Sequence, residues 1–133
     1  METRIVKDKI TREELRAIAN EQYGDIKMTV SKERWFTLTL AEQLGNIGSE
    51  VGRARSWAGK DESSFWGAVT RALVLLDLTQ ADPRWTVRRK ELDRARESFA
   101  DAVLGGEMYG SRLSDLENYF MQFALISTLY RHK

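Results

Sequence analysis

An aliphatic segment that stops at a proline constrains this chain more than any other feature. Residues 65–82 carry Phe, Trp, Val and Leu at helical spacing, and Pro83 leads at once into an arginine-rich stretch. Pro83 has no backbone N–H and fits the first turn of a helix, while Asp82 before it is a suitable N-cap. The segment therefore predicts two helices that meet at a sharp corner.

Apolar periodicity extends this helical pattern over most of the chain. Helices are expected near residues 32–58, 62–79, 83–104 and 114–131. Short connections make consecutive helices antiparallel neighbours. The sequence thus predicts a mainly α fold, with an up-and-down four-helix bundle over residues 31–133. The side chains expected inside it are Trp57, Trp66, Leu73, Leu76, Phe99, Phe120 and Phe123.

Three glycines interrupt the first long helix. Gly45, Gly48 and Gly52 fall on one face of it, and each costs about 1 kcal/mol relative to alanine. A neighbouring helix packed closely against this face would account for them. The alternative is a break in the helix near residues 45–48.

Residues 1–30 follow a different pattern. Residues 4–6 and 25–30 have the composition and alternation of short strands, and Thr11 and Glu14 have the spacing of a helix capping box. We therefore predict a small N-terminal α/β extension. Two strands and one helix bury little surface alone, so this extension must pack against the rest of the chain or another subunit.

Composition argues against several kinds of chemistry. The 133 residues include no cysteine and one histidine, His132. Disulfides, cysteine-based metal sites and a thiol nucleophile are excluded, and no histidine-based triad is visible. We therefore predict no cofactor and no metal, and a nucleotide or RNA hydrolase is the third-ranked function. No apolar run is long enough to span a membrane, and the lack of cysteine fits a cytoplasmic location.

Asp77 lies among apolar residues of the second long helix. A buried aspartate needs an arginine or several backbone donors beside it. Arg53 and Arg71 are the expected partners, so a buried ion pair between helices is the preferred interpretation. A polar ligand pocket is the alternative.

The helix after the corner is rich in cations. Six cationic residues lie between positions 84 and 96 of a chain with net charge +1. Arg84, Arg88, Arg89 and Arg96 are candidate phosphate contacts, so an RNA-binding accessory protein is the second hypothesis. Glu91 and Asp93 interrupt these cations and Glu97 follows them, which favours a solvated face with internal ion pairs.

The preferred function is a non-enzymatic interaction module that binds a protein partner, either another protein or a second copy of this chain. Large aromatic side chains dominate many protein interfaces. Trp35 and Tyr109 are the candidate contacts.

Residues 44–130 also resemble a family of small, uncharacterised prokaryotic helical proteins. The resemblance covers an aliphatic helix, an Asp-Pro-x-Trp corner, a Phe-x-Asp segment, a Tyr-x-Ser segment and an aromatic last helix. The matching residues are Arg71–Thr79, Asp82–Trp85, Phe99–Asp101, Tyr109–Ser111 and Tyr119–Ala124. This family implies a helical fold and no particular reaction.

Two further resemblances, one of the N-terminal residues and one of the helical region, are looser. Residues 4–34 are similar to the start of another uncharacterised short bacterial family. The helical region is similar in outline to HEPN proteins, many of which carry an arginine four to six residues before a histidine. His132 directly follows Arg131 and has no arginine at that spacing. The HEPN resemblance therefore implies a non-catalytic bundle, closer to the substrate-binding or partner-binding members.

Overall fold

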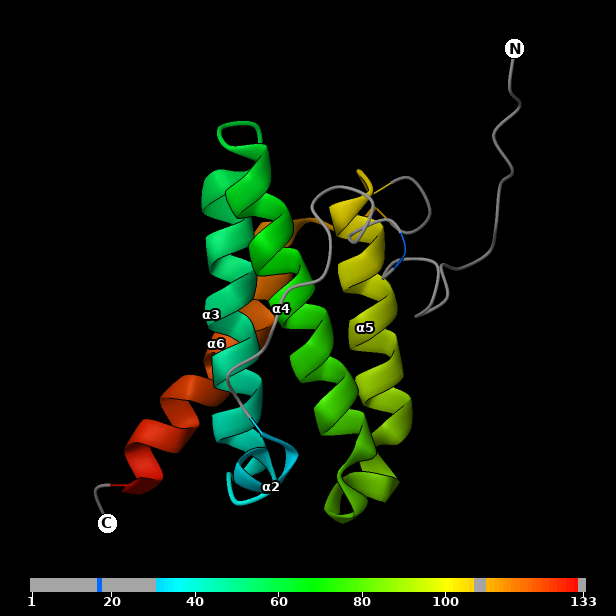
Figure 1. Ribbon diagram of the computed structural model, residues 1–133. Coiled ribbons are helices and arrows are strands. Elements are labelled where there is room, and N and C mark those ends of the chain that lie inside the picture. Colours follow the sequence, from blue (N-terminus) through cyan, green and yellow to red (C-terminus); the bar gives the residue numbers. More distant parts are fainter. Residues whose placement is uncertain (1–16, 18–30, 107–109, 132–133) are drawn as a thin grey trace.

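The computed structural model describes residues 17, 31–106 and 110–131, and no side chain beyond residue 126. This part of the chain is mainly helical and contains no strand. Figure 1 shows its long helices, α3 and α4 side by side, α5 next to α4, and α6 behind α3. The elements are α2 (Lys32–Trp35), α3 (Leu40–Trp57), α4 (Glu62–Ala81), the 3-10 helix η1 (Pro83–Arg88), α5 (Arg89–Val103) and α6 (Leu113–Arg131).

The predicted helical class is confirmed, whereas the predicted helix over residues 32–58 is wrong. The chain forms the short helix α2, leaves the helical path after Trp35, and begins α3 at Leu40. Thr39 accepts a hydrogen bond from the Glu42 backbone N–H, and the Glu42 carboxylate accepts one from the Thr39 N–H. This capping box starts a new helix. The proposed α/β extension lies outside the described residues.

The corner at Asp82 and Pro83 forms as predicted, but the helix after it begins differently. Asp82 caps the next segment by accepting a hydrogen bond from the Arg84 N–H. The first six residues then form η1, in which Trp85 has non-helical dihedrals (φ −106°, ψ 26°), and the α-helix starts at Arg89. The single helix predicted over residues 83–104 is therefore divided in two.

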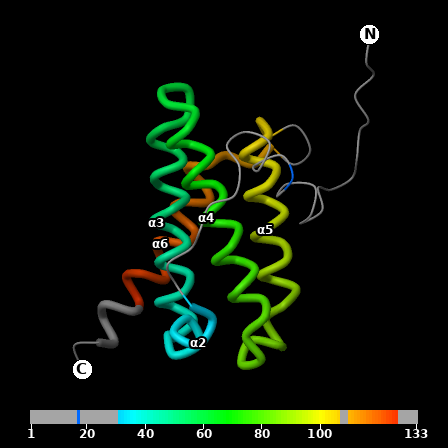
Figure 2. Tube along the Cα trace, viewed as in Figure 1, coloured from blue at the N-terminus to red at the C-terminus, as the bar shows by residue number. Residues whose placement is uncertain are grey.

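The three glycines of α3 lie against α6, so the prediction of a close helix crossing is confirmed. A Cβ atom placed on Gly45 would lie 3.0 Å from the Ala124 Cβ, and one on Gly48 would lie 2.8 Å from the Phe120 Cβ. Only a residue without a side chain allows the two backbones to approach this closely. Figure 2 shows the resulting path of α6, which passes behind α3 and continues beyond it.

Most of the predicted interior is confirmed. Trp66, Leu73, Leu76, Phe99 and Phe120 are buried, and Phe123 packs against the core while partly exposed. Trp57 is the exception, because 42% of its surface is exposed. It is the last residue of α3, and the α3–α4 turn follows directly, with Gly59 at φ +76°. Trp57 thus lies at the end of its helix, partly open to solvent in the part of the chain that the structure describes.

Candidate interaction site

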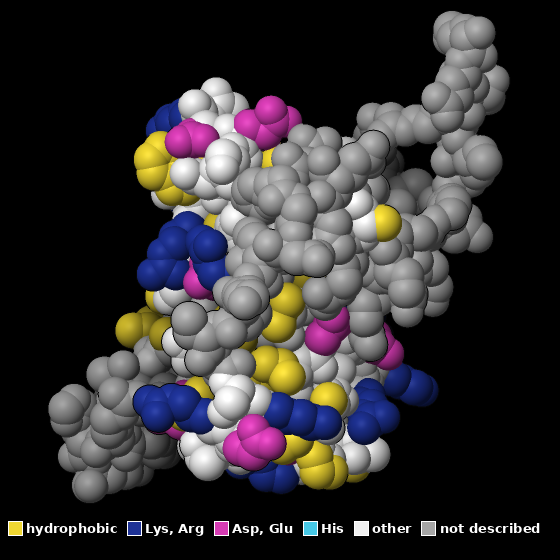
Figure 3. All heavy atoms as spheres, in the orientation of Figure 1, with side chains coloured by type: hydrophobic (Ala, Val, Ile, Leu, Met, Phe, Trp, Pro, Cys, Tyr) yellow, Lys and Arg dark blue, Asp and Glu magenta, His cyan; other side chains and the backbone are white. Residues whose placement is uncertain are grey.

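The predicted phosphate contacts are largely engaged with carboxylates of the same chain. Arg84 Nη2 lies 2.6 Å from Asp82 Oδ2, and Arg88 Nη2 lies 2.8 Å from Glu91 Oε1. Arg96 is only 5% exposed, so its assignment as a phosphate contact is wrong. Arg89 remains on the surface. On the face shown in Figure 3, Lys and Arg side chains lie in separate groups with Asp and Glu among them.

The predicted ion pair also has different partners. Arg53 and Arg71 both contact Glu50, each at 3.1 Å. Asp77 lies 3.6 Å from Arg96 of α5 instead. Sequence periodicity identified Asp77 as partly buried, but the choice among arginines depends on how α4 and α5 rotate against each other. That rotation is a tertiary property.

Trp35, predicted as an exposed partner contact, is a core residue. Its side chain is 1% exposed, and its indole Nε1–H donates a hydrogen bond of 3.0 Å to Thr79 Oγ1. The break after α2 turns this indole inward, which a continuous helix from residue 32 could not do. Tyr109, the other predicted contact, lies outside the described residues.

A buried polar cluster joins α2, α3 and α4 at the corner. The Gln43 amide donates to the Trp35 carbonyl (2.8 Å) and to Asp82 Oδ2 (3.2 Å), and it accepts from the Trp85 indole (2.8 Å). The hydrogen bonds from Arg84 are the main cause that lowers the pKa of Asp82, and the Gln43 amide adds to the effect. Every donor and acceptor of Gln43 is thus occupied within the chain.

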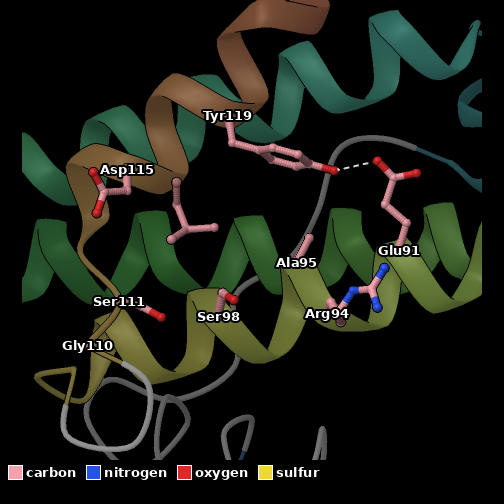
Figure 4. Close-up of a pocket in the computed structure, with 9 residues that line it drawn as sticks. Glu91, Arg94, Ala95, Ser98, Gly110, Ser111, Asp115 and Tyr119 are labelled. Atoms are coloured by element: carbon pink, nitrogen blue, oxygen red, sulfur yellow. Dashed lines mark hydrogen bonds between the residues drawn. The ribbon is translucent and has the colours of Figure 1, made fainter.

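A groove of about 580 Å³ lies between α5 and α6. Figure 4 shows the Tyr119 ring reaching across it to Glu91. The Tyr119 hydroxyl donates a 2.8 Å hydrogen bond to Glu91 Oε2. Burial and this bond raise the pKa of Tyr119 to about 12, and the same bond, helped by Arg88, lowers the pKa of Glu91. At neutral pH the pair is an ionised acceptor with a protonated donor, which holds α5 to α6.

The outer side of α6 has the opposite character. Leu125 is 67% exposed, Ile126 42% and Met121 37%. An open hollow of about 640 Å³ lies on the same helix, lined by Asn118, Met121, Gln122, Ala124 and Leu125. Apolar periodicity does not reveal this surface, because it indicates which face of α6 is inward but not what covers the other sides. The available signal was the stretch 118–130, which contains no charged residue and no histidine.

The described residues include no group of three or more acidic or histidine side chains placed to hold a metal ion. None of the helices seen in this part of the chain has the length and apolarity needed to cross a membrane. No protein-family model matches the chain, and comparison with curated proteins and with solved structures likewise finds no match.

Proposed function

We propose that this chain is a helical interaction module, built on an up-and-down bundle of its four long helices, that binds a protein partner through the outer side of α6. The observation that carries this proposal is the exposure of Met121, Leu125 and Ile126 on one helix. A helix that is apolar on all sides is normally buried on all sides. Here α3 covers one side, and the outer side stays open to a partner.

The charge distribution favours a protein over RNA as the partner. Nucleic-acid binding requires cations that are free to neutralise phosphates. Arg84 and Arg88 contact carboxylates at less than 3 Å, and Arg96 is buried. The outer side of α6, by contrast, presents apolar and amide groups, which suit a protein surface.

A photo-reactive amino acid at position 122 tests this proposal. Gln122 is exposed and borders the hollow on α6. We expect irradiation of the full chain in its native lysate to give a protein adduct whose yield falls when Leu125→Glu is added. The matched control is Val87→Glu, because Val87 is 93% exposed on η1, away from α6.

The salt dependence of the adduct separates the two partner classes. An apolar interface retains its yield at moderate salt, whereas RNA binding weakens steeply as phosphate counterions compete. Failure to obtain any protein adduct, or an RNA adduct that disappears with added salt, would overturn the proposal.

A further inference from the structure

We infer that the partner is a second copy of this chain, with the outer sides of two α6 helices packed antiparallel about a two-fold axis. This inference rests on the proposed function, because it uses the same surface. It adds the identity of the occupant and the way in which the two helices meet.

The first argument is that α6 carries both a projection and a hollow on the same side. Leu125, 67% exposed, lines the C-terminal end of the hollow, which extends about two turns toward the N-terminus, past Gln122 and Met121 to Asn118. In a two-fold interface the same patch serves both copies, so that residue i contacts j and j contacts i. A projection and a hollow on one patch satisfy that condition.

The second argument fixes the direction of the helices. In a parallel pair each residue faces its own counterpart, so Leu125 would meet Leu125 and leave both hollows empty. In an antiparallel pair the order is reversed, and Leu125 of each copy reaches the region of Asn118 in the other. The two-fold axis then passes near Met121 and Gln122, midway between these positions.

The third argument is electrostatic. Residues 118–126, which include the described part of this side, carry no charge, so two copies of this surface do not repel each other. The Gln122 side-chain amide, which lies near the axis, contains donors and an acceptor and can therefore pair with the identical amide of the other copy. A partner selected by charge would find no complementary group on this side.

The fourth argument is that α6 is held in place from behind. Gly45 and Gly48 bring α3 against Ala124 and Phe120, and Tyr119 is bonded to Glu91 of α5. The outer side of α6 is therefore presented on a fixed helix, and little conformational freedom is lost on association.

Single-cysteine cross-linking tests the arrangement directly, because the natural chain contains no cysteine. Disulfides form between residues whose Cα atoms lie within about 7 Å. Under mild oxidation we expect Gln122→Cys to form a disulfide-linked dimer rapidly. Asn118→Cys and Leu125→Cys should link slowly when oxidised alone and rapidly when mixed. Val87→Cys is the control for random collision.

The cross-linking pattern has two outcomes that overturn the inference. A Gln122→Cys yield no higher than that of Val87→Cys would show that the two α6 helices do not meet. Equal self-linking at positions 118, 122 and 125 would indicate parallel helices and would overturn the antiparallel arrangement.

The association state of the full chain separates this inference from the proposed function. By sedimentation over about a hundredfold range of concentration, we expect a monomer–dimer equilibrium, since association follows mass action. Leu125→Glu should weaken it at least about tenfold, because each copy would bury a carboxylate. The chain could instead stay monomeric at every concentration while the adduct at position 122 has the mass of a different protein. That result would overturn the inference that the partner is a second copy and would retain the proposed function. A monomer with no adduct would overturn both.

Discussion

The corner around Gln43 and the outer side of α6 differ in which groups they bury. At the corner, Trp35, Gln43 and Asp82 are each at most 1% exposed, and their polar groups find partners within the chain. On the outer side of α6, residues 118–126 include no charged side chain, and Leu125 is 67% exposed. Polar groups are enclosed in one region, and apolar groups are left open in the other.

The difference separates what stabilises the fold from what is available for binding. Buried, fully paired polar groups are costly to disturb because any lost partner leaves an unsatisfied atom. Exposed apolar groups contribute little to the stability of the single chain, but they gain when another surface covers them. Substitutions in the two regions should therefore have opposite effects on unfolding and on association.

The largest effect on stability is expected for Asp82→Ala. The change removes the cap of η1, one of the two acceptors of the Gln43 amide, and the carboxylate that pairs with the Arg84 guanidinium. The free energy of unfolding should fall by about 2–4 kcal/mol, measured by chemical denaturation. Because the folded pKa of Asp82 is lowered, its contribution is present above its ordinary pKa of 3.8 and is lost as the pH falls through the folded value. A loss below about 0.5 kcal/mol would show that the corner is no more sensitive than ordinary surface.

Gly48→Ala should have the second-largest effect. Its new Cβ would lie 2.8 Å from the Phe120 Cβ and force α3 and α6 apart. We expect a net loss of about 1–2 kcal/mol, because overpacking outweighs the better helix propensity of alanine.

Gly52→Ala is the matched control for Gly48→Ala. Its Cβ would meet the Glu117 carboxylate, the far end of a flexible side chain. This change should range from neutral to a gain of about 1 kcal/mol. Equal losses at both glycines would argue against a crossing centred on Gly48.

Tyr119→Phe should have a smaller effect that depends on pH. The change removes the hydrogen bond to Glu91 and should cost about 1 kcal/mol near neutral pH. The folded pKa of Tyr119 is raised from 10.0 to about 12, so its contribution is complete below pH 10 and is lost as the pH rises through 12. The stability difference between the natural chain and the variant should therefore shrink from pH 10 to 12. A constant difference over that window would contradict the role of this bond.

Leu125→Glu should have the smallest effect on the unfolding of the single chain. Its side chain is already mostly in solvent, so the stability measured at high dilution should change by less than about 0.5 kcal/mol. The same substitution should weaken association strongly. A large loss of stability at high dilution would show that Leu125 belongs to the core and would end the contrast between the two regions.

The sequence predicted those features that depend on local signals. The cap at Asp82 and the glycine row of α3 are short-range patterns, and the structure confirms both. The start of α3 differs from the prediction although Thr39 and Glu42 have capping-box spacing, because apolar residues at helical spacing continue back to residue 36. A continuous stripe is weaker evidence than a cap that satisfies two backbone N–H groups.

The candidate site could be predicted less well, since it depends on tertiary contacts. Nothing local distinguishes Arg96, which is buried, from Arg89, which is exposed. The inward position of Trp35 depends on Thr79, which is 44 residues away in the sequence. Prediction of the exposed outer side of α6 depends on two tertiary facts. The helix α3 covers one side of α6, and α5 meets it across an open groove.

The position of Gln43 also governs the alignment of the helices along their axes. The Gln43 amide reaches all its partners only when the segment before α3 and the residues after α4 have one particular position along the axis of α3. A shift of α4 along α3 by one turn, about 5.4 Å, would keep apolar side chains in contact but would bury an unpaired amide. Such a penalty is about 1–3 kcal/mol. Contacts between leucine and alanine side chains tolerate sliding, whereas the hydrogen bonds of Gln43 fix how α3 and α4 are aligned along their axes.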